Sequence, residues 1–236
     1  MSGGGGAAAS ALSSPWRSLL HRALEANAHL KHSTFFQLSN RFFRPRWVGA
    51  AGRRIAPSYS GVRRRSPLPC PPILPVLIWI FVPFRGFQAQ CDKIQINTDA
   101  RNNKIGEIRN CPFGEICWYF ADTWEQFRIS GSIDVIDSSN PEPAMLQLRE
   151  RAWFGSSVKS RLQYIGPCPG VPVPDDDLVE NSHLDPSAGP VDAFCLLVLD
   201  PEKVDYLSLK SNQRLMFTRS QKGDGSNDWR AEKINP

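Results

Sequence analysis

The stretch that most constrains the fold is residues 93–137, KIQINTDARNNKIGEIRNCPFGEICWYFADTWEQFRISGSIDVID, in which apolar residues recur at every second position. This period is typical of strands that bury one face. The alternation is formed by Ile94, Ile96, Ile116, Trp118, Phe120, Phe127, Ile129, Ile133 and Val135. The stretch therefore predicts a mainly β structure, and we interpret the rest of the chain around it.

A polar turn, residues 98–104, separates the first two predicted strands and leads into a short helical segment, residues 105–109, that ends before Pro112. The turn places hydroxyl, amide and ammonium groups where a helix begins. Backbone N–H groups at a helix start attract anions. The sequence therefore predicts a seat for a phosphate group at this turn.

The net charge of +5 in 236 residues would ordinarily suggest nucleic acid or an anionic membrane as a partner. Residues 41–85, however, contain nine arginines and no acid, so the rest of the chain carries net negative charge. The basic character belongs to one segment. We therefore discount a nucleic-acid binder and expect no nucleic-acid partner.

Six cysteines are scattered without a CxxC pair or neighbouring histidines, so we expect no metal site. The start of the chain is rich in Gly, Ala and Ser and lacks the apolar core of a secretory signal. Free thiols in a reducing compartment fit best, which predicts the cytoplasm. The Ala- and Ser-rich start also allows a plastid.

The remaining segments predict helices at the edges of a sheet. Residues 1–14 read as a disordered tail, a helix follows to about residue 29, and residues 33–38 have strand character. A second helix is predicted over residues 144–160, packed by Leu148, Ala152 and Phe154, with a cationic end formed by Arg149, Arg151, Lys159 and Arg161.

Three predicted strands, residues 194–199, 203–209 and 213–218, precede a last strand near Lys233. The total is about seven strands and three helices. Antiparallel strands with such short connections predict an α+β fold, a β-barrel with flanking helices.

Residues 39–85 fit neither period. The first part is rich in arginine and the second, SPLPCPPILPVLIWIFVPF, is rich in proline and then apolar. Its uninterrupted apolar core, residues 76–82, is far shorter than the roughly 20 residues that span a bilayer. We therefore expect no membrane insertion and no regular element in this segment.

Several motifs of the chain are recognisable: INTDARNNKIGEI, CWYFADTWEQFRISG, RERAWF, the SVKSR run at residues 157–161, VDYLSLKSNQRLMFTR and the closing Asp228-Trp229. Together they resemble the pyridoxamine 5′-phosphate oxidase-like flavoproteins, in particular their plant and cyanobacterial branch. The resemblance covers residues 15–38 and 86–236. It implies a split β-barrel homodimer that binds FMN at the subunit interface.

The resemblance also implies which residues hold FMN. They are Thr98, Asn102, Asn103 and Lys104 for the phosphate and ribityl chain, and Gln126, Arg214 and Trp229 near the flavin ring or the C-terminal motif. The family commonly has Ser-Arg-Lys where this chain has residues 102–104. An amide thus replaces a guanidinium that could bind phosphate through two donors.

For the substrate, the resemblance implies a phosphorylated vitamin B6 vitamer, oxidised to pyridoxal 5′-phosphate with O2 as acceptor. Lys159, Ser160, Arg161 and Lys210 are the substrate-binding candidates, and no residue is assigned as a catalytic acid or base. The family's C-terminal Arg-x-His appears here as Lys210-x-Asn212. The alternative is an FMN-binding flavoprotein that does not turn over B6 vitamers.

The family's second strand has the form GRPANRTVVFRG, which is absent from the chain at this place. Residues 50–62 can nevertheless be written in codons whose shifted frame spells that strand, and Phe84-Arg85 permits the 3′ end of an intron. We hypothesise that residues 39–85 arise from a frameshift and a retained intron, which would disrupt the barrel's second strand. A genuine basic regulatory insertion is the alternative, and residues 86–236 form the rest of the FMN-binding domain.

Overall fold

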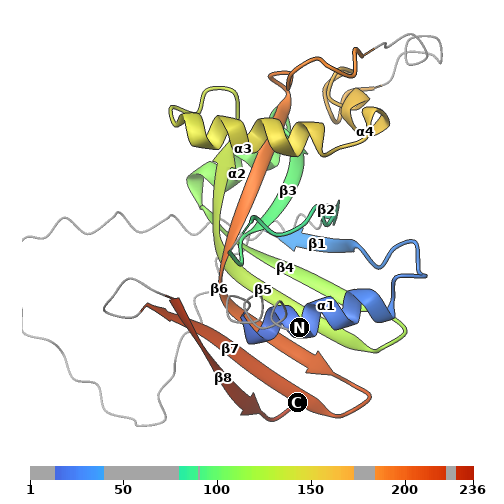
Figure 1. Cartoon of the computed structure of the whole chain (residues 1–236), viewed down its shortest axis with the longest axis vertical. Coiled ribbons are helices and arrows are strands. Elements are labelled where there is room, and N and C mark those ends of the chain that lie inside the picture. Colours follow the sequence, from blue (N-terminus) through green and yellow to red (C-terminus); the bar gives the residue numbers. More distant parts are fainter. Residues whose placement is uncertain (1–13, 40–79, 90, 173–183, 222–226) are drawn as a thin grey trace, which may run out of the picture.

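The computed structural model describes residues 14–39, 80–89, 91–172, 184–221 and 227–236. Helices lie on one antiparallel sheet that is strongly bent (Figure 1). The helices are α1 (Pro15–Ala26), α2 (Asn103–Asn110), α3 (Pro143–Phe154) and α4 (Val158–Leu162). The strands are β1 (Phe35–Ser39), β2 (Ile80–Pro83), β3 (Ile94–Asp99), β4 (Phe113–Phe120), β5 (Glu125–Ile136), β6 (Phe194–Ser208), β7 (Gln213–Gln221) and β8 (Asn227–Ile234).

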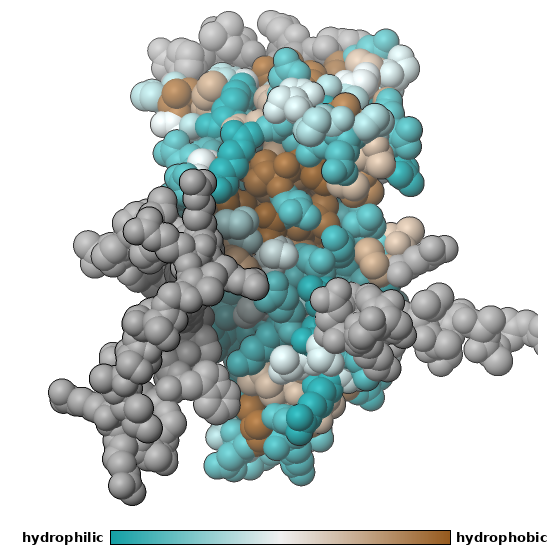
Figure 2. Space-filling view, turned by 90° about the vertical axis from the view of Figure 1, so that its left-hand side faces the viewer, coloured by the Kyte–Doolittle hydropathy of each residue, from teal (hydrophilic) through white to brown (hydrophobic). Residues whose placement is uncertain are grey.

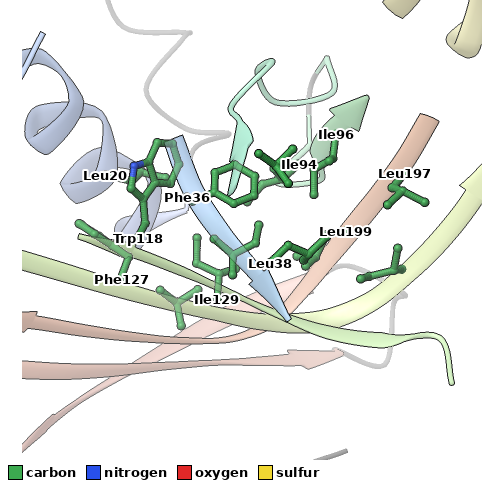
Figure 3. Close-up of a cluster of buried hydrophobic side chains, with 14 of the residues drawn as sticks. Leu20, Phe36, Leu38, Ile94, Ile96, Trp118, Phe127, Ile129, Leu197 and Leu199 are labelled. Atoms are coloured by element: carbon green, nitrogen blue, oxygen red, sulfur yellow. The ribbon is translucent and has the colours of Figure 1, made fainter. Parts of the chain in front are cut away.

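Alternating side chains build the core, as the sequence predicts. In β3 each apolar residue is buried and each following polar residue is only partly buried. Strands β1, β3, β4, β5 and β6 and helix α1 all contribute to one cluster (Figure 3), whose labelled members are Leu20, Phe36, Leu38, Ile94, Ile96, Trp118, Phe127, Ile129, Leu197 and Leu199. Burial of this apolar surface is the main term that holds the strands together.

Strand β6 lies at the centre of the sheet, and its two halves pair with different strands. Its first half pairs with β3 on one side and β5 on the other, and its second half pairs with β5 and β7. The register between β5 and β6 shifts at Gly131. A Cβ on Gly131 would collide with the carbonyl oxygen of Asp200, so only glycine fits at this bulge.

Strand β2 lies within residues 39–85, so the expectation that this segment contains no regular element is wrong. Strand β2 pairs antiparallel with β1 in the register Phe36 to Val82. The chain then reaches β3, where the Gln95 N–H donates to the Gly86 carbonyl at 3.1 Å and Phe87 bridges to Ile94. A short second strand therefore lies at the edge of the sheet beside β1, and residues 40–79 lie outside the described part of the chain.

Helix α1 is fixed to the sheet by a polar clasp around Asp92. One carboxylate oxygen of Asp92 accepts from the Ser14 hydroxyl and the other from the Trp229 indole N–H, each at 2.9 Å. The Trp229 ring also packs edge-on against the buried Trp16, with centroids 5.8 Å apart. The first helix and the last strand are thus held by the same residue.

The predicted helix over residues 144–160 is wrong in its length; of its predicted packing residues, Leu148 and Ala152 do pack against the core and Phe154 does not. It divides into α3 and α4, because the Ser157 hydroxyl accepts from the Ser160 N–H and begins a new helix. Trp153 is fully buried, whereas Phe154 is 44% exposed. Arg149 and Arg161, expected at a cationic end, are buried and donate to backbone carbonyls.

The described ranges contain eight strands and four helices, against about seven and three expected. Strand β2 and the separate α4 are added, whereas the predicted strands at residues 194–199 and 203–209 form one strand, β6. No helix within the described ranges is long and apolar enough to cross a membrane.

Candidate functional site

The turn between β3 and α2 forms a polar corner, defined here by Thr98, Asn102 and Lys104. The Asn102 side chain caps α2 by accepting from the Lys104 backbone N–H at 3.1 Å. This bond fixes the first turn of an eight-residue helix, and the positive end of its dipole points at the corner. The local sequence therefore builds a helix start that suits an anion.

Two polar groups at this corner have no partner among the described residues. The Thr98 hydroxyl is buried and makes no hydrogen bond. No hydrogen bond or ion pair within the described ranges holds the Lys104 ammonium, and burial lowers its pKa from the usual 10.5. Buried polar groups normally have partners, so this corner fits a ligand that supplies acceptors.

The charges around Lys104 explain why it lacks a counter-ion. Asp99, whose charge acts on Lys104, is held by the Arg101 guanidinium through two bonds of 2.9 and 2.6 Å. Cys195 also lies near Lys104, but burial raises its pKa to about 12, so it stays a neutral thiol. An anionic group entering the corner would therefore find one uncompensated positive charge.

A second hollow of about 430 Å³ lies between β3 and α3. Two exposed arginines, Arg85 and Arg151, line it; Arg151 donates to the Gln147 carbonyl at 3.3 Å, and within the described ranges neither arginine forms an ion pair. Its other lining residues are Gln88, Ala89, Gln95, Asn97, Leu148, Ala152, Gly155 and Ser156. We name it the α3 pocket; two cations and several amides make it suitable for a small anion.

The FMN-binding domain of pyridoxamine 5′-phosphate oxidase matches residues 81–137. The pyridoxine/pyridoxamine 5′-phosphate oxidase 2 of Arabidopsis thaliana is 49% identical over 222 residues, which cover 94% of this chain and 97% of that protein. The chain belongs to the pyridoxamine 5′-phosphate oxidase-like, FMN-binding family.

Two solved structures agree with this assignment of the fold. A pyridoxamine 5′-phosphate oxidase-related, FMN-binding protein of Nostoc punctiforme is 31% identical, with a TM-score of 0.74 over 95% of this chain and 99% of its own. PhzG of Burkholderia lata is 16% identical, with a TM-score of 0.62 over 95% and 93%. The split-barrel fold predicted from the sequence is confirmed.

As a member of this family, the chain departs from the family's second-strand motif. When GRPANRTVVFRG is placed on the shared Phe84-Arg85-Gly86, the motif's three arginines fall on Val76, Ile80 and Arg85. Only Arg85 is retained. Together with Asn103 in place of the usual arginine, this leaves Lys104 as the cation of the corner.

The flavin-ring candidates lie on the outer face of the sheet, away from the core. Gln126, Leu207 and Arg214 stand side by side on β5, β6 and β7. Gln126 donates to the Cys117 sulfur at 3.3 Å, and Arg214 binds both carboxylate oxygens of Asp205 at 2.9 and 2.8 Å. The Asp205 partner raises the pKa of Arg214.

Thr98 and Gln126 are not brought together within one chain. Thr98 pairs with Cys195 on the face that carries the core, whereas Gln126 lies on the opposite face of the same sheet. Asn102 acts as the helix cap and Asn103 is exposed. Trp229 belongs to the clasp around Asp92, which gives it a structural role.

The predicted substrate residues do not form one cluster. Arg161 is buried, donates to the Pro186 carbonyl at 2.9 Å and lies over the Trp153 ring, so it holds a loop. Ser160 is engaged with Ser157, and Lys159 is exposed. Lys210 donates to the Asp122 carbonyl in a neighbouring hairpin.

Asn212, which stands where the family has a histidine, has a backbone φ of 49°. Asparagine adopts this left-handed conformation more readily than most residues. Asn212 therefore serves the turn between β6 and β7.

Sequence reasoning missed the α3 pocket. Its residues Arg85, Asn97, Arg151 and Ser156 come from three separate segments. The retained Phe-Arg-Gly at residues 84–86 is the signal that could have identified Arg85.

Proposed function

We propose that the chain is an FMN-dependent oxidase of pyridoxamine and pyridoxine 5′-phosphate, which forms pyridoxal 5′-phosphate with O2 as acceptor. The observation that carries this proposal is the presence of two separate cationic places, the polar corner and the α3 pocket, in a chain of this family. One suits the phosphate of the cofactor and the other the phosphate of the substrate. The relative that is 49% identical is named for the same reaction.

FMN is the cofactor, and the polar corner fits its phosphate group. Lys104 supplies the positive charge, the Thr98 hydroxyl supplies a donor, and the start of α2 supplies backbone N–H groups. FMN held there would supply the two-electron redox chemistry that links the substrate to O2. The protein's own contribution is binding and orientation, which needs no strong acid or base.

The α3 pocket replaces Lys159, Ser160 and Arg161 as the proposed seat of the substrate phosphate. Arg85 follows β2 and Arg151 lies on α3, so their guanidinium groups approach the hollow from two elements. Guanidinium groups bind phosphate oxygens through paired, charge-assisted hydrogen bonds.

A homodimer would complete the site. The residues expected near the flavin ring lie on the outer sheet face, while Thr98 lies on the core side, so a second copy could supply the missing half. Figure 2 shows an apolar area at mid-height on one side of the molecule, surrounded by hydrophilic residues. Such a patch is typical of protein interfaces.

A reducing compartment, the cytoplasm or a plastid, is supported by the thiol state of the cysteines. Cys91, Cys117, Cys168 and Cys195 carry free thiols. Disulfides are rare in reducing compartments.

The second candidate is a flavoprotein without B6 turnover. The positions of the missing arginines, Ile80 and Asn103, and the loss of the C-terminal histidine at Asn212 favour it. These departures weaken phosphate binding and leave the hydrogen-bond donors near a substrate incomplete.

The test is an aerobic assay of the purified, FMN-loaded protein with pyridoxamine 5′-phosphate, in which pyridoxal 5′-phosphate and peroxide are measured. Arg151→Met should raise KM at least tenfold because a phosphate contact is lost. Lys159→Met, an exposed cation on the next helix, is the control and should leave KM unchanged. A flavin spectrum without any product would overturn the oxidase and favour the second candidate.

A further inference from the structure

Asn97 places an unpaired acceptor in the α3 pocket. Its amide nitrogen donates to the Ser156 hydroxyl at 2.9 Å, and that hydroxyl also contacts the Ala152 carbonyl at 3.1 Å. The side-chain oxygen of Asn97 is buried and has no partner in the described part of the chain. The amide is thus fixed at its nitrogen, and its oxygen is left as a buried acceptor beside the pocket.

An unsatisfied buried carbonyl oxygen is destabilising, so such a group is usually paired in the working state of a protein. Its natural partner here is a ligand atom, since Asn97 itself lines the pocket. The atom must carry a proton, because the Asn97 oxygen can only accept. The pocket therefore suits a molecule that combines a phosphate, for Arg85 and Arg151, with an N–H or O–H donor.

We propose that Asn97 is a specificity-determining residue that accepts a hydrogen bond from the C4′ amine or hydroxyl of a phosphorylated B6 vitamer. This inference rests on the proposed function and deepens it. Both substrates carry a donor at C4′, whereas the product carries an aldehyde oxygen there, which is only an acceptor. Two acceptors repel, so Asn97 favours substrate over product and promotes product release.

Ser156 is the positioning residue for this contact. By accepting the amide N–H, it prevents the Asn97 side chain from rotating by 180° and presenting its NH₂ group to the ligand. With the amide turned round, the pocket would offer a donor and would favour the aldehyde. The Asn97 and Ser156 pair therefore determines that the pocket favours the substrate over the aldehyde product.

The experiment compares the affinities of two ligands, with and without the C4′ oxygen, for the wild-type protein and for variants of Asn97. The FMN-loaded protein is reduced without air, so that no turnover occurs, and titrated calorimetrically with pyridoxine 5′-phosphate and with its analogue 4-deoxypyridoxine 5′-phosphate, which lacks only the C4′ oxygen. Wild type should bind the hydroxyl-bearing ligand about tenfold more tightly, the size of one good buried hydrogen bond. In Asn97→Leu the two affinities should agree within about twofold.

Two further variants keep the test informative if Asn97→Leu folds poorly. Ser156→Ala should reduce the ratio to about threefold, because the amide is no longer held in one orientation. Gln95→Leu, two residues earlier on the same face of β3 and also lining the pocket, is the matched control and should retain the tenfold ratio.

A second readout separates specificity from packing. Asn97→Asp places a carboxylate beside the C4′ group and should shift the kcat/KM preference about tenfold toward the cationic pyridoxamine 5′-phosphate over pyridoxine 5′-phosphate. An equal change for both substrates would overturn the inference, as would a tenfold ligand ratio that survives in Asn97→Leu. If the ligand ratio behaves as expected but no pyridoxal 5′-phosphate forms, the proposed function fails and the role of Asn97 stands.

Discussion

The polar corner at the start of α2 and the outer face of β5 to β7 both carry conspicuous polar residues, but they differ in how those residues are satisfied. On the outer face Arg214 is paired with Asp205, and Gln126 with Cys117. At the corner the Lys104 ammonium and the Thr98 hydroxyl have no partner in the described ranges. Polar groups that satisfy one another can stabilise a fold by themselves, whereas buried groups left open indicate a ligand.

The largest effect on stability should come from Trp229 in the clasp around Asp92, because its polar group, like those of the outer face, is paired within the fold. Trp229→Ala removes an indole that packs on Trp16 and donates to Asp92, and should lower the free energy of unfolding by about 3 kcal/mol. Urea denaturation measures this. Trp229→Phe, which keeps the ring contact and loses the N–H, should cost about 1 kcal/mol; an equally large loss of FMN affinity with unchanged stability would show that Trp229 is a ligand contact instead.

Lys104→Met should have the opposite effect to Trp229→Ala: it should weaken FMN binding and leave stability intact. The loss of the corner's uncompensated charge should weaken FMN binding about 100-fold, equal to roughly 2.7 kcal/mol, without lowering stability, because a desolvated ammonium is removed. Flavin fluorescence quenching measures the affinity. Riboflavin, which lacks the phosphate, is the control ligand and should bind both proteins alike.

Ile80→Arg tests whether the motif's missing arginine accounts for a weakened corner. If the motif's arginine meets the flavin phosphate, restoring it should tighten FMN binding about tenfold. Riboflavin affinity should stay constant. Tightening of both ligands to the same extent would mean that the substitution stabilises β2 rather than the phosphate.

The pH dependence of FMN binding should also report on Lys104. Burial lowers its pKa below 10.5, so its ammonium is present below that lowered value and is lost as the pH rises through it. The affinity ratio of FMN to riboflavin should fall over that range, at a lower pH than for an ordinary lysine. In the apo-protein stability should rise between the lowered pKa and 10.5, because the unfolded chain binds more protons there.

The smallest effect on stability is expected at the ion pair between Asp205 and Arg214 on the outer face. Asp205→Asn breaks the bond to Arg214, which is partly exposed, and should cost less than about 1 kcal/mol of stability. Thermal melting measures this. A marked change in the flavin reduction potential in the same variant would instead place Arg214 beside the ring.

The strands and the corner could be predicted from the sequence because both depend on local patterns. The alternation around Trp118 and Phe127 and the polar turn before Lys104 are each contained in a few residues. Two other features depend on elements that are distant in sequence. One is the burial of Trp153 in place of Phe154, and the other is the burial of Arg149 against the Phe194 and Val191 carbonyls.

The α3 pocket was missed for the same reason as those packing choices. Its two guanidinium groups come from different elements, and the unpaired oxygen of Asn97 is visible only when Ser156 is placed. The hypothesis of a frameshift and a retained intron in residues 39–85 is a matter for the nucleotide sequence. Codons for residues 50–62 that do not spell GRPANRTVVF in the shifted frame would contradict it.

The clasp around Asp92 has a consequence for the integrity of the chain. Residues 14–39 are anchored by the buried Trp16 and Leu20, by pairing of β1 with β4, and by the bond from Ser14 to Asp92. None of these contacts depends on the peptide that joins β1 to β2. A protein cut between those strands should therefore remain a complex of two fragments, and the two pieces, expressed separately, should reassemble into one barrel.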